Sequence, residues 1–305
     1  MTAAQFDAWS ERSVDGFVAQ QVAAGLHARS EARALAESEF AALLPAGLTT
    51  PMHHLWQVLA ADEVVGWLWL RVHAAPGEVE AYVFDVEIEP RSRGRGLGRA
   101  TMLAAETAAR RLGADVVRLN VFGHNHAALR LYEGLEYTTT GATLTKQLLA
   151  DPPSAASAPH VTLRSVDAHA YLAWRPRLLQ RFSPDELAWL LPHGRLSPGH
   201  LLQSAHADGR TVGLVWLHVR ERSDGDHAFG YHLEVPEQLR SLGYGRAVLA
   251  EAERGCRDRG VRSVRLSLSS PSDLATRPFF ERAGFEITAR SMAKRLAGRH
   301  TRSRP

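Results

Sequence analysis

The hydrophobic and polar positions of the chain follow two periods. Short runs rich in branched and aromatic side chains predict strands, and longer stretches with an apolar residue every three or four positions predict helices. In the first half the predicted strands are 56–60, 64–72, 80–88, 116–121 and 137–149. The predicted helices are 6–21, 97–112 and 125–135. Because strands and helices alternate along the chain, we expect an α/β fold.

The predicted strand at 80–88 carries acids between its apolar residues. A strict period of two would put these apolar side chains on one face: Tyr82, Phe84, Val86 and Ile88. Asp85 and Glu87 would then share the opposite face. We therefore expect two carboxylates close together on one strand.

The second half of the chain repeats the first. Three motifs recur in the same order, at offsets of 147, 147 and 148 residues. They are VGWLWLRV (65–72) with VGLVWLHV (212–219), RGRGLGRA (93–100) with RSLGYGRA (240–247), and LYEGLEY (131–137) with FFERAGF (279–285). Because both the order and the spacing are kept, we interpret the chain as two copies of one domain.

A segment rich in proline, serine and alanine separates the copies. Residues 151–159 read DPPSAASAP, which is typical of a linker. We predict one domain at 1–150, a second at 160–297 and a basic tail at 298–305. The second copy begins with an apolar segment at 161–164 that has no counterpart before the first helix of the first copy. We expect the sheet edge left open in the first copy to be covered by the second copy or by a partner chain.

A turn rich in glycine and arginine precedes the predicted helix at 97–112. It reads RSRGRGLGRA (91–100). Such a turn leaves the first N–H groups of the helix unpaired at the positive end of the helix dipole, where they suit a phosphate. Two common phosphate loops do not fit, because no Gly-Lys-Ser/Thr is present and Thr101 stands where a dinucleotide fingerprint needs glycine. A solvated turn without a ligand is the alternative.

A second motif follows, NHAALRLYEGLEY at 125–137. The order strand, Arg93-x-x-Gly96-x-Gly98, helix, strand and this segment resembles the GNAT superfamily of N-acetyltransferases. The resemblance extends over both halves and departs from the family at Glu136, where glycine is usual. It implies two tandem GNAT domains, each with a mixed α+β sheet. It also implies that acetyl-CoA is the acetyl donor and that a primary amine attacks it directly.

The resemblance implies which residues hold acetyl-CoA. In the family, the loop binds the pyrophosphate, and the main chain of the preceding strand hydrogen-bonds the pantetheine arm. The cofactor-binding residues implied in this way are Val86, Ile88, Arg93, Gly94, Arg95, Gly96, Leu97, Gly98, Arg99 and Asn125.

The resemblance also implies an acid and a base. Tyr132 would protonate the departing thiolate, and a buried structural tyrosine is the alternative. We select Glu87 as the base that takes the amine proton through water. Asp85 is the other candidate, and the alternative for both acids is that they only attract a cationic amine.

The second copy keeps the loop and loses the rest of the expected chemistry. Its loop residues are Arg240, Gly243 and Gly245. Asp273 and Phe280 stand where the first copy has asparagine and tyrosine, and phenylalanine has no proton to donate. Pro278 lies inside the corresponding helical segment and would strain it. We expect the first copy to be catalytic and the second to be structural or regulatory, and the sequence leaves open whether the second binds coenzyme A.

Composition narrows the remaining choices. The net charge of +3 and the lack of aromatic platforms among the basic residues do not favour a nucleic-acid partner. Cys256 is the only cysteine, so no intrachain disulfide forms. His53 and His54 are adjacent and have no evident third ligand, so we expect no metal. Only two of the 36 basic residues are lysines, Lys146 and Lys294.

The acceptor is not encoded in a recognisable motif. Acidic residues near the expected cleft favour a cationic amine on a small molecule or a peptide. A mycothiol-synthase-like tandem acetyltransferase, active in its C-terminal half, is the runner-up, and a non-catalytic acyl-CoA-binding module is the alternative from another class. No apolar run reaches the roughly 18 residues that span a bilayer. Without a signal-peptide pattern either, we expect a cytoplasmic monomer or homodimer with no membrane partner.

Overall fold

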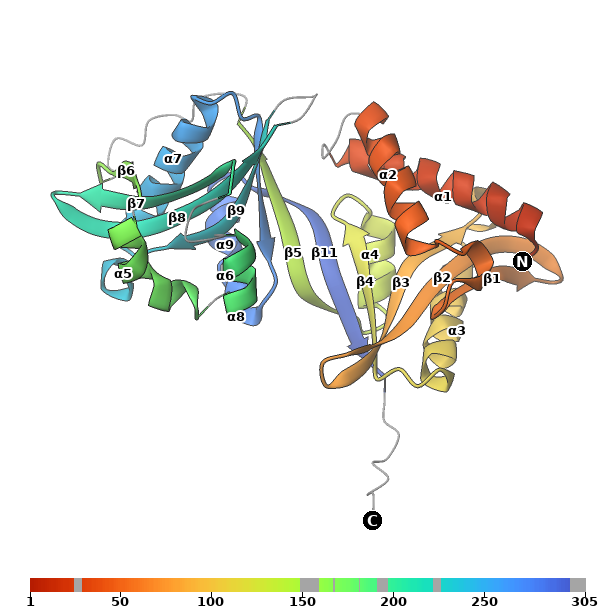
Figure 1. Ribbon diagram of the computed structural model, residues 1–305. Coiled ribbons are helices and arrows are strands. Elements are labelled where there is room, and N and C mark those ends of the chain that lie inside the picture. Colours follow the sequence, from red (N-terminus) through yellow and green to blue (C-terminus); the bar gives the residue numbers. More distant parts are fainter. Residues whose placement is uncertain are drawn as a thin grey trace, which may run out of the picture. The chain divides into compact units, whose positions relative to one another are not determined.

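The computed structural model divides the chain into two compact units (Figure 1). It describes residues 1–24, 29–148, 159–166, 168–180, 182–190, 197–221 and 226–296. Unit 1 contains residues 1–142, 269–274 and 287–305, and unit 2 contains 143–268 and 275–286. This division differs from the expected domains at 1–150 and 160–297, because residues 143–150 fall in unit 2 and residues 269–274 and 287–297 fall in unit 1. Except for Pro159, the expected linker lies outside the described residues, as does the expected tail.

Unit 1 is built on a mixed sheet with the strand order β1-β2-β3-β4-β11-β5. Only β3 and β4 of the described pairs in this unit run parallel. Its strands are β1 (His53–Ala60), β2 (Glu63–Ala75), β3 (Glu78–Ile88), β4 (Val116–Phe122), β11 (Glu286–Arg295) and the first part of β5 (Thr138–Gln147). Its helices are α1 (Ala3–Ala23), α2 (Arg29–Leu43), η1 (Gly47–Thr49), η2 (Pro90–Ser92), α3 (Leu97–Arg111), α4 (His126–Glu133) and α8 (Pro271–Leu274). Among the described residues no strand precedes α1. β1 is the outer strand, and no described strand of the second copy pairs with it, so the second copy does not extend the sheet at this edge as we expected.

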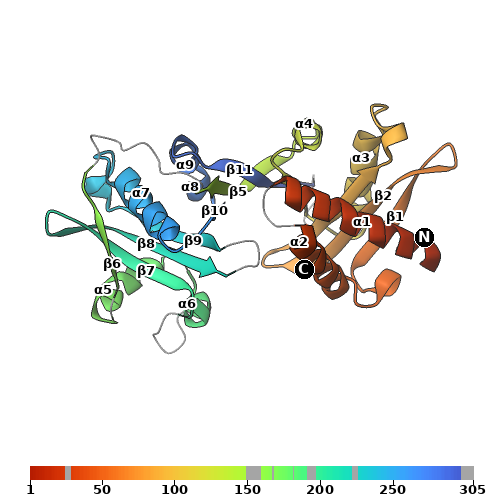
Figure 2. The same cartoon turned by 90° about the horizontal axis from the view of Figure 1, so that it is seen from above.

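Helices cover both faces of this sheet (Figure 2), and alternate residues of β2 pack against them. Leu68 and Leu70 pack into a core cluster with buried residues of α3 and α4. Trp67 and Trp69 belong to the opposite cluster, which includes Trp9 of α1. The sheet therefore lies between α3 and α4 on one side and α1 and α2 on the other, which is how a strand buried on both faces acquires its continuous apolar sequence.

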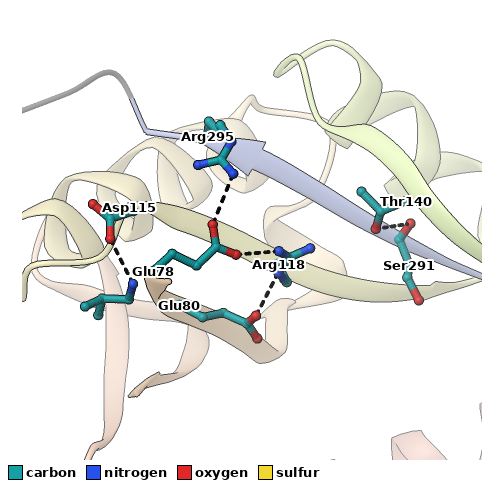
Figure 3. Close-up of polar contacts among 8 residues, drawn as sticks. Glu78, Glu80, Asp115, Arg118, Thr140, Ser291 and Arg295 are labelled. Atoms are coloured by element: carbon teal, nitrogen blue, oxygen red, sulfur yellow. Dashed lines mark hydrogen bonds and ion pairs between the residues drawn. The ribbon is translucent and has the colours of Figure 1, made fainter. Parts of the chain in front are cut away.

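The last strand of the sequence lies in the middle of the unit 1 sheet. β11 runs antiparallel to β4, from the pair Ala289 and Phe122 to the pair Arg295 and Val116. On its other side, Thr140 of β5 donates a side-chain hydrogen bond to the carbonyl oxygen of Ser291 at 3.3 Å (Figure 3). Residues from the C-terminal copy therefore complete the sheet of the N-terminal copy.

Ion pairs anchor the end of β11 against the start of β3 and β4 (Figure 3). Arg118 of β4 contacts Glu78 at 2.6 Å and Glu80 at 2.7 Å. Glu78 also contacts Arg295 of β11 at 3.2 Å. Because Glu78 is shared between two arginines, it ties the last residue of β11 to the two parallel strands.

Unit 2 repeats this plan with the strand order β5-β10-β9-β8-β7-β6. Besides the end of β5, its strands are β6 (Thr162–Ser165), β7 (His200–Ala207), β8 (Arg210–Arg220), β9 (His227–Glu234) and β10 (Ser263–Leu268). Its helices are α5 (Ala168–Leu178), α6 (Pro184–Leu190), η4 (Glu237–Leu239), α7 (Tyr244–Arg257) and α9 (Arg277–Arg282). β6 is the extra first strand expected from the sequence.

The two copies share polar details at the same offset. The indole N–H of Trp69 donates to Nδ1 of His53 at 2.8 Å, and that of Trp216 donates to Nδ1 of His200 at 3.1 Å. His53 therefore has a structural partner in the fold. This agreement between side chains supports the interpretation of the chain as an internal repeat.

A β-bulge changes which residues of β3 share a face. Trp69 pairs with Asp85, and the next residue, Leu70, pairs with Val83, so Phe84 has no partner on β2. A bulge adds one residue and breaks the period of two. Phe84 consequently packs with the cluster under α1, whereas Val86 packs with the opposite cluster. The expectation that these two side chains share a face is wrong.

The helix after β10 also differs from the sequence prediction. The chain forms two short helices, α8 and α9, instead of one. Pro278 lies in the first turn of α9, after the N-cap residue Thr276. Proline is tolerated at that position because the first N–H groups of a helix have no partner within the helix. The expected strain at Pro278 is therefore absent.

Candidate active site

The parallel strands β3 and β4 separate towards their C-terminal ends. Their pairing runs from Glu80 with Val116 to Val83 with Leu119. β3 continues to Ile88, five residues beyond the last pair. Backbone N–H and C=O groups need partners when they are buried. The β4-facing groups in the last part of β3 are therefore placed to hydrogen-bond an extended ligand between the strands.

The glycine loop between β3 and α3 has the conformation of an open cradle. Gly94 and Gly96 have φ angles of 75° and 78°, a region in which residues with a Cβ are strained. Gly96 is the N-cap of α3 and provides no side-chain cap, so N–H groups of the first turn stay available. A Cβ added at either glycine would meet no atom within 4 Å. The loop therefore leaves free space where an anion would approach the helix.

The arginines of this loop divide into anchors and one free cation. Nε of Arg93 donates to the carbonyl oxygen of Ile88 at 2.7 Å, and Nη1 of Arg99 donates to that of Gly134 at 2.9 Å. Arg91 pairs with Glu89 at 2.7 Å. Arg95 makes no hydrogen bond or ion pair with other described residues.

These contacts separate two roles that the sequence pattern could not distinguish. Arg93 ties the loop to the strand before it, and Arg99 ties α3 to the end of α4. Arg95 is consequently the side chain of this loop that is most available to a phosphate. Gly98 and Leu97 lie in the first turn of α3 and would contribute through their backbone.

Asn125 and Tyr132 lie at opposite ends of α4. Asn125 is the N-cap, and its Oδ1 accepts the N–H of Ala128 at 3.1 Å, so only its amide NH₂ is left to donate to a ligand. Tyr132 is 6% exposed and packs in the core cluster. Its hydroxyl makes no hydrogen bond to the residues that the structure describes.

The phenol of Tyr132 is held in its protonated form. Burial, with a further contribution from the Asp85 carboxylate, raises its pKa to about 12. A neutral phenol is a proton donor, and a nearby carboxylate opposes its ionisation. The structure thus brings Tyr132 within electrostatic range of Asp85, the other candidate for the base.

Asp85 and Glu87 lie on the α1 side of the sheet. Ser13 of α1 donates a hydrogen bond to Oδ2 of Asp85 at 2.8 Å. Burial raises the pKa of Asp85 despite this bond. The pKa of Glu87 is also raised, first by burial and then by the charge of Asp85, with Arg12 opposing the shift. Both carboxylates are therefore shifted towards the range in which a base works.

α1 supplies contacts that the sequence reasoning missed. Successive turns of this helix contact successive strands. Trp9 packs on Trp69 of β2, and Ser13 hydrogen-bonds Asp85 of β3. Further along the helix, Phe17 packs on Phe122 of β4, and Gln20 hydrogen-bonds His124. The sequence did carry a signal for these contacts, because the spacing of the four α1 residues places them on one face of a helix. α1 therefore closes the side of the opening that carries the acids.

The equivalent region of unit 2 has a different surface. Ser241, with φ of 62°, stands in the place of Gly94. Leu242 is 59% exposed and stands in the place of Arg95. A Cβ at Gly243 would lie 3.2 Å from Cδ of Pro159, so the space beside this glycine is covered by Pro159. His232 stands in the place of Asp85 and contacts Glu234 at 3.2 Å.

Comparison with known proteins decides the family. The family model described as the acetyltransferase (GNAT) family matches residues 24–137 and 164–285, which together span more than half of the chain. The chain belongs to the acetyltransferase (GNAT) family. It is an acyltransferase, and members of this family generally use acetyl-CoA as the donor.

Individual relatives resemble parts of this acetyltransferase. The uncharacterized N-acetyltransferase YycN of Bacillus subtilis is 32% identical over 149 residues, which cover 48% of this chain and 96% of that protein. The mycothiol acetyltransferase of Thermobispora bispora is 46% identical over 83 residues, which cover 26% of this chain and 28% of that protein.

A solved structure of a related enzyme can be compared with most of the chain. The GCN5-related N-acetyltransferase of Sphaerobacter thermophilus matches with a TM-score of 0.54 at 20% identity, over 92% of this chain and 90% of that one. This likeness shows a shared fold. Within the described residues of the acetyltransferase, no helix is long and apolar enough to cross a membrane.

Proposed function

We propose that unit 1 transfers the acetyl group of acetyl-CoA to a primary amine, and that unit 2 is structural or regulatory. The observation that carries this proposal is Tyr132, a buried phenol of α4 whose pKa is raised by burial and by the charge of Asp85. Asp85 lies on β3 beyond its last pair with β4. Unit 2 has Phe280 at the corresponding position and cannot donate a proton there.

The proposed donor site begins at the loop before α3. Backbone N–H groups would bind the pyrophosphate, from Gly94, Gly96, Leu97 and Gly98. Arg95 would add positive charge at the phosphates. Two further arginines, Arg93 and Arg99, would hold the loop in its conformation. The separated backbone from Val86 to Ile88 and the amide of Asn125 would hold the pantetheine arm. The covered space beside Gly243 supports a single donor site per chain.

In the proposed reaction, the amine nitrogen attacks the thioester carbonyl carbon directly. A C–N bond forms, the C–S bond breaks, and Tyr132 gives its proton to the departing sulfur. Glu87 receives the proton of the amine through water and is then available to return it to Tyr132 through solvent. Asp85 opposes ionisation of Tyr132 and raises the pKa of Glu87, so it supports both groups by its charge.

The proposed acceptor is a cationic amine on a small molecule or a peptide. Asp85 and Glu87, which share one side of the opening, favour a positive charge over a negative one. Mycothiol acetylation is the second candidate, supported by the 46% identity to a mycothiol acetyltransferase over 83 residues. A non-catalytic acyl-CoA-binding module would bind acetyl-CoA and give no product.

The test is turnover with the full chain. Acetyl-CoA is mixed with a panel of primary amines, including an aminosugar, a polyamine and a peptide with a free N-terminus. Release of the coenzyme A thiol and formation of an N-acetyl amide are both measured. Tyr132→Phe is expected to lower kcat by roughly 10²–10⁴-fold, the usual effect of losing a general acid.

The matched variant is Phe280→Tyr, which places a phenol at the corresponding position of unit 2. It should add no activity, because the space beside Gly243 is covered by Pro159. Full turnover by Tyr132→Phe would rule out the proposed acid, and thiol release without an amide product would rule out amine acetylation.

A further inference from the structure

The only two lysines of the chain form equivalent buried ion pairs. Nζ of Lys294, on β11, lies 2.9 Å from both carboxylate oxygens of Glu106 on α3. Nζ of Lys146, on β5, lies 2.8 and 2.7 Å from those of Glu253 on α7. The glutamates are 1% and 3% exposed. Each lysine therefore binds the helix that follows a glycine loop.

An aromatic ring completes each pair. The ammonium group of Lys294 lies 5.8 Å from the ring centroid of Tyr137, and that of Lys146 lies 5.8 Å from the ring of Phe285. A cation over a ring gains a favourable contact when both are removed from water. Lysine suits this position because its ammonium is compact, whereas the planar guanidinium of arginine is larger. The chain keeps lysine here although its other 34 basic residues are arginine.

In unit 1 the pair is linked to the proposed acid. The rings of Tyr137 and Tyr132 have centroids 5.8 Å apart, and the N–H of Tyr137 donates to the carbonyl oxygen of Tyr132 at 3.0 Å. The pKa of Tyr137 is raised by burial and then by the Glu106 carboxylate. Lys294 therefore contacts both Glu106 and the Tyr137 ring, and the Tyr137 ring contacts Tyr132. In unit 2, the corresponding ring, Phe280, has no hydroxyl group.

We propose that Lys294 is a positioning residue for Tyr132. Its ammonium, held in place by Glu106, lies over the ring of Tyr137, which packs against Tyr132 and sets the direction of the phenol. This inference rests on the proposed acid role of Tyr132. Loss of Lys294 would leave the buried Glu106 carboxylate with Arg110, at 3.5 Å, as its remaining cation, so Glu106 would move towards Arg110 or protonate. Either change alters the support of the Tyr137 ring.

The experiment separates positioning from stability by removing both charges together. Removing one partner of a buried pair destabilises the fold, whereas replacing both by apolar residues of similar size is often neutral. Lys294→Met should therefore lower the melting temperature by about 5–10 °C. Lys294→Met with Glu106→Leu should restore most of that loss. The matched control is Lys146→Met with Glu253→Leu in unit 2.

Activity is measured with acetyl-CoA and the fastest amine of the panel. The unit 1 double variant should lower kcat by about 10- to 100-fold with little change in KM for acetyl-CoA, because small misplacements of a catalytic group have effects of this size. The unit 2 double variant should keep the kcat of the natural chain. Equal kcat for both double variants would show that the Lys294 pair only stabilises the fold and would overturn the inference.

A double-mutant cycle with Tyr132→Phe identifies the group through which Lys294 acts. If Lys294 acts through Tyr132, the unit 1 double variant should lower kcat no further in the Tyr132→Phe background. An additive loss would overturn the positioning role and leave the acid role intact. If Tyr132→Phe itself keeps full kcat, the acid role fails, and the positioning role fails with it.

Discussion

At the scale of single residues, Asp85 and Glu87 differ in what surrounds them although they are two positions apart on β3. Asp85 accepts a hydrogen bond from Ser13 and acts on the pKa values of both Tyr132 and Glu87. Glu87 is influenced by Asp85, Arg12 and Arg93. The sequence identified both acids as candidates. It could not rank them, because the ranking depends on α1 and α4, which are distant in the chain.

The raised pKa of Glu87 predicts the acid limb of the pH profile. A base must be ionised, so kcat/KM should fall as pH decreases through the Glu87 pKa, and this fall should begin above the ordinary value of 4.5. Asp85→Asn should move the limb to lower pH, because a neighbouring negative charge is removed. Glu87→Gln should lower kcat/KM and remove the limb.

The pH profiles of the natural chain, Asp85→Asn and Glu87→Gln are measured with the same acceptor amine. The ionisation of that amine then contributes equally to each profile. A limb that is unchanged in Glu87→Gln and lost in Asp85→Asn would transfer the role of base to Asp85.

At the scale of elements, the turn after α4 shows how a departure from the family pattern is accommodated. The family usually has glycine where this chain has Glu136, and Glu136 adopts φ of 68°. The N–H of Tyr137 still bonds to the carbonyl oxygen of Tyr132, so the glycine-type turn is kept. In unit 2 the corresponding residue is Gly284, with φ of 88°.

This turn predicts opposite effects for two matched substitutions. A residue with a Cβ in the left-handed region loses roughly 1–2 kcal/mol, partly offset by the greater freedom of glycine in the unfolded chain. Glu136→Gly should therefore raise the free energy of unfolding by about 0.5–1 kcal/mol, and Gly284→Glu should lower it by a similar amount. Denaturant unfolding measures both, and a destabilised Glu136→Gly would contradict the account.

The positions of the helices and strands were largely predictable from the sequence, whereas the face of the sheet on which each side chain lies was not. The strands, helices and repeat follow from local periodicity and from the 147-residue offset. The bulge at Phe84 has no signature in the alternation of β3, and it moved Val86 to the opposite face from Phe84. The break between α8 and α9 was readable from Pro278, once proline is considered as the start of a helix.

At the scale of the whole molecule, the exchange of the last strands could not be predicted from the sequence. Pairing between residues that lie more than 150 positions apart leaves no local pattern. The two lysines of the chain, Lys146 and Lys294, lie on the two strands concerned, but only the structure shows what they bind. Met292, within β11, and Leu296, just after it, are buried in the same core cluster as Tyr132.

The exchange predicts that residues 1–150 alone fail to fold stably, because β11 and Lys294 are missing from that fragment. β5 lies beside β11, with Thr138 near Ala293 and Thr140 near Ser291. The control for this fragment is a protein in which an Asn-Gly turn joins residues 1–142 to residues 289–296. Such a turn favours a tight antiparallel hairpin. This graft should restore solubility and a cooperative melting transition, and a cooperatively melting 1–150 fragment would show that β11 is dispensable.

The central claim is that unit 1 alone binds the acetyl donor, and calorimetric titration with acetyl-CoA tests it most directly. The compared proteins are the natural chain, Gly96→Val with Gly98→Val, and Gly243→Val with Gly245→Val. Gly96 and Gly243 have φ of 78° and 86°, so both pairs strain the backbone, and the valine at 243 also presses on Pro159. Melting curves establish whether each variant is folded. We expect one acetyl-CoA per natural chain, no binding in the unit 1 variant and unchanged binding in the unit 2 variant. Two molecules per chain, or loss of binding in the unit 2 variant alone, would contradict the account.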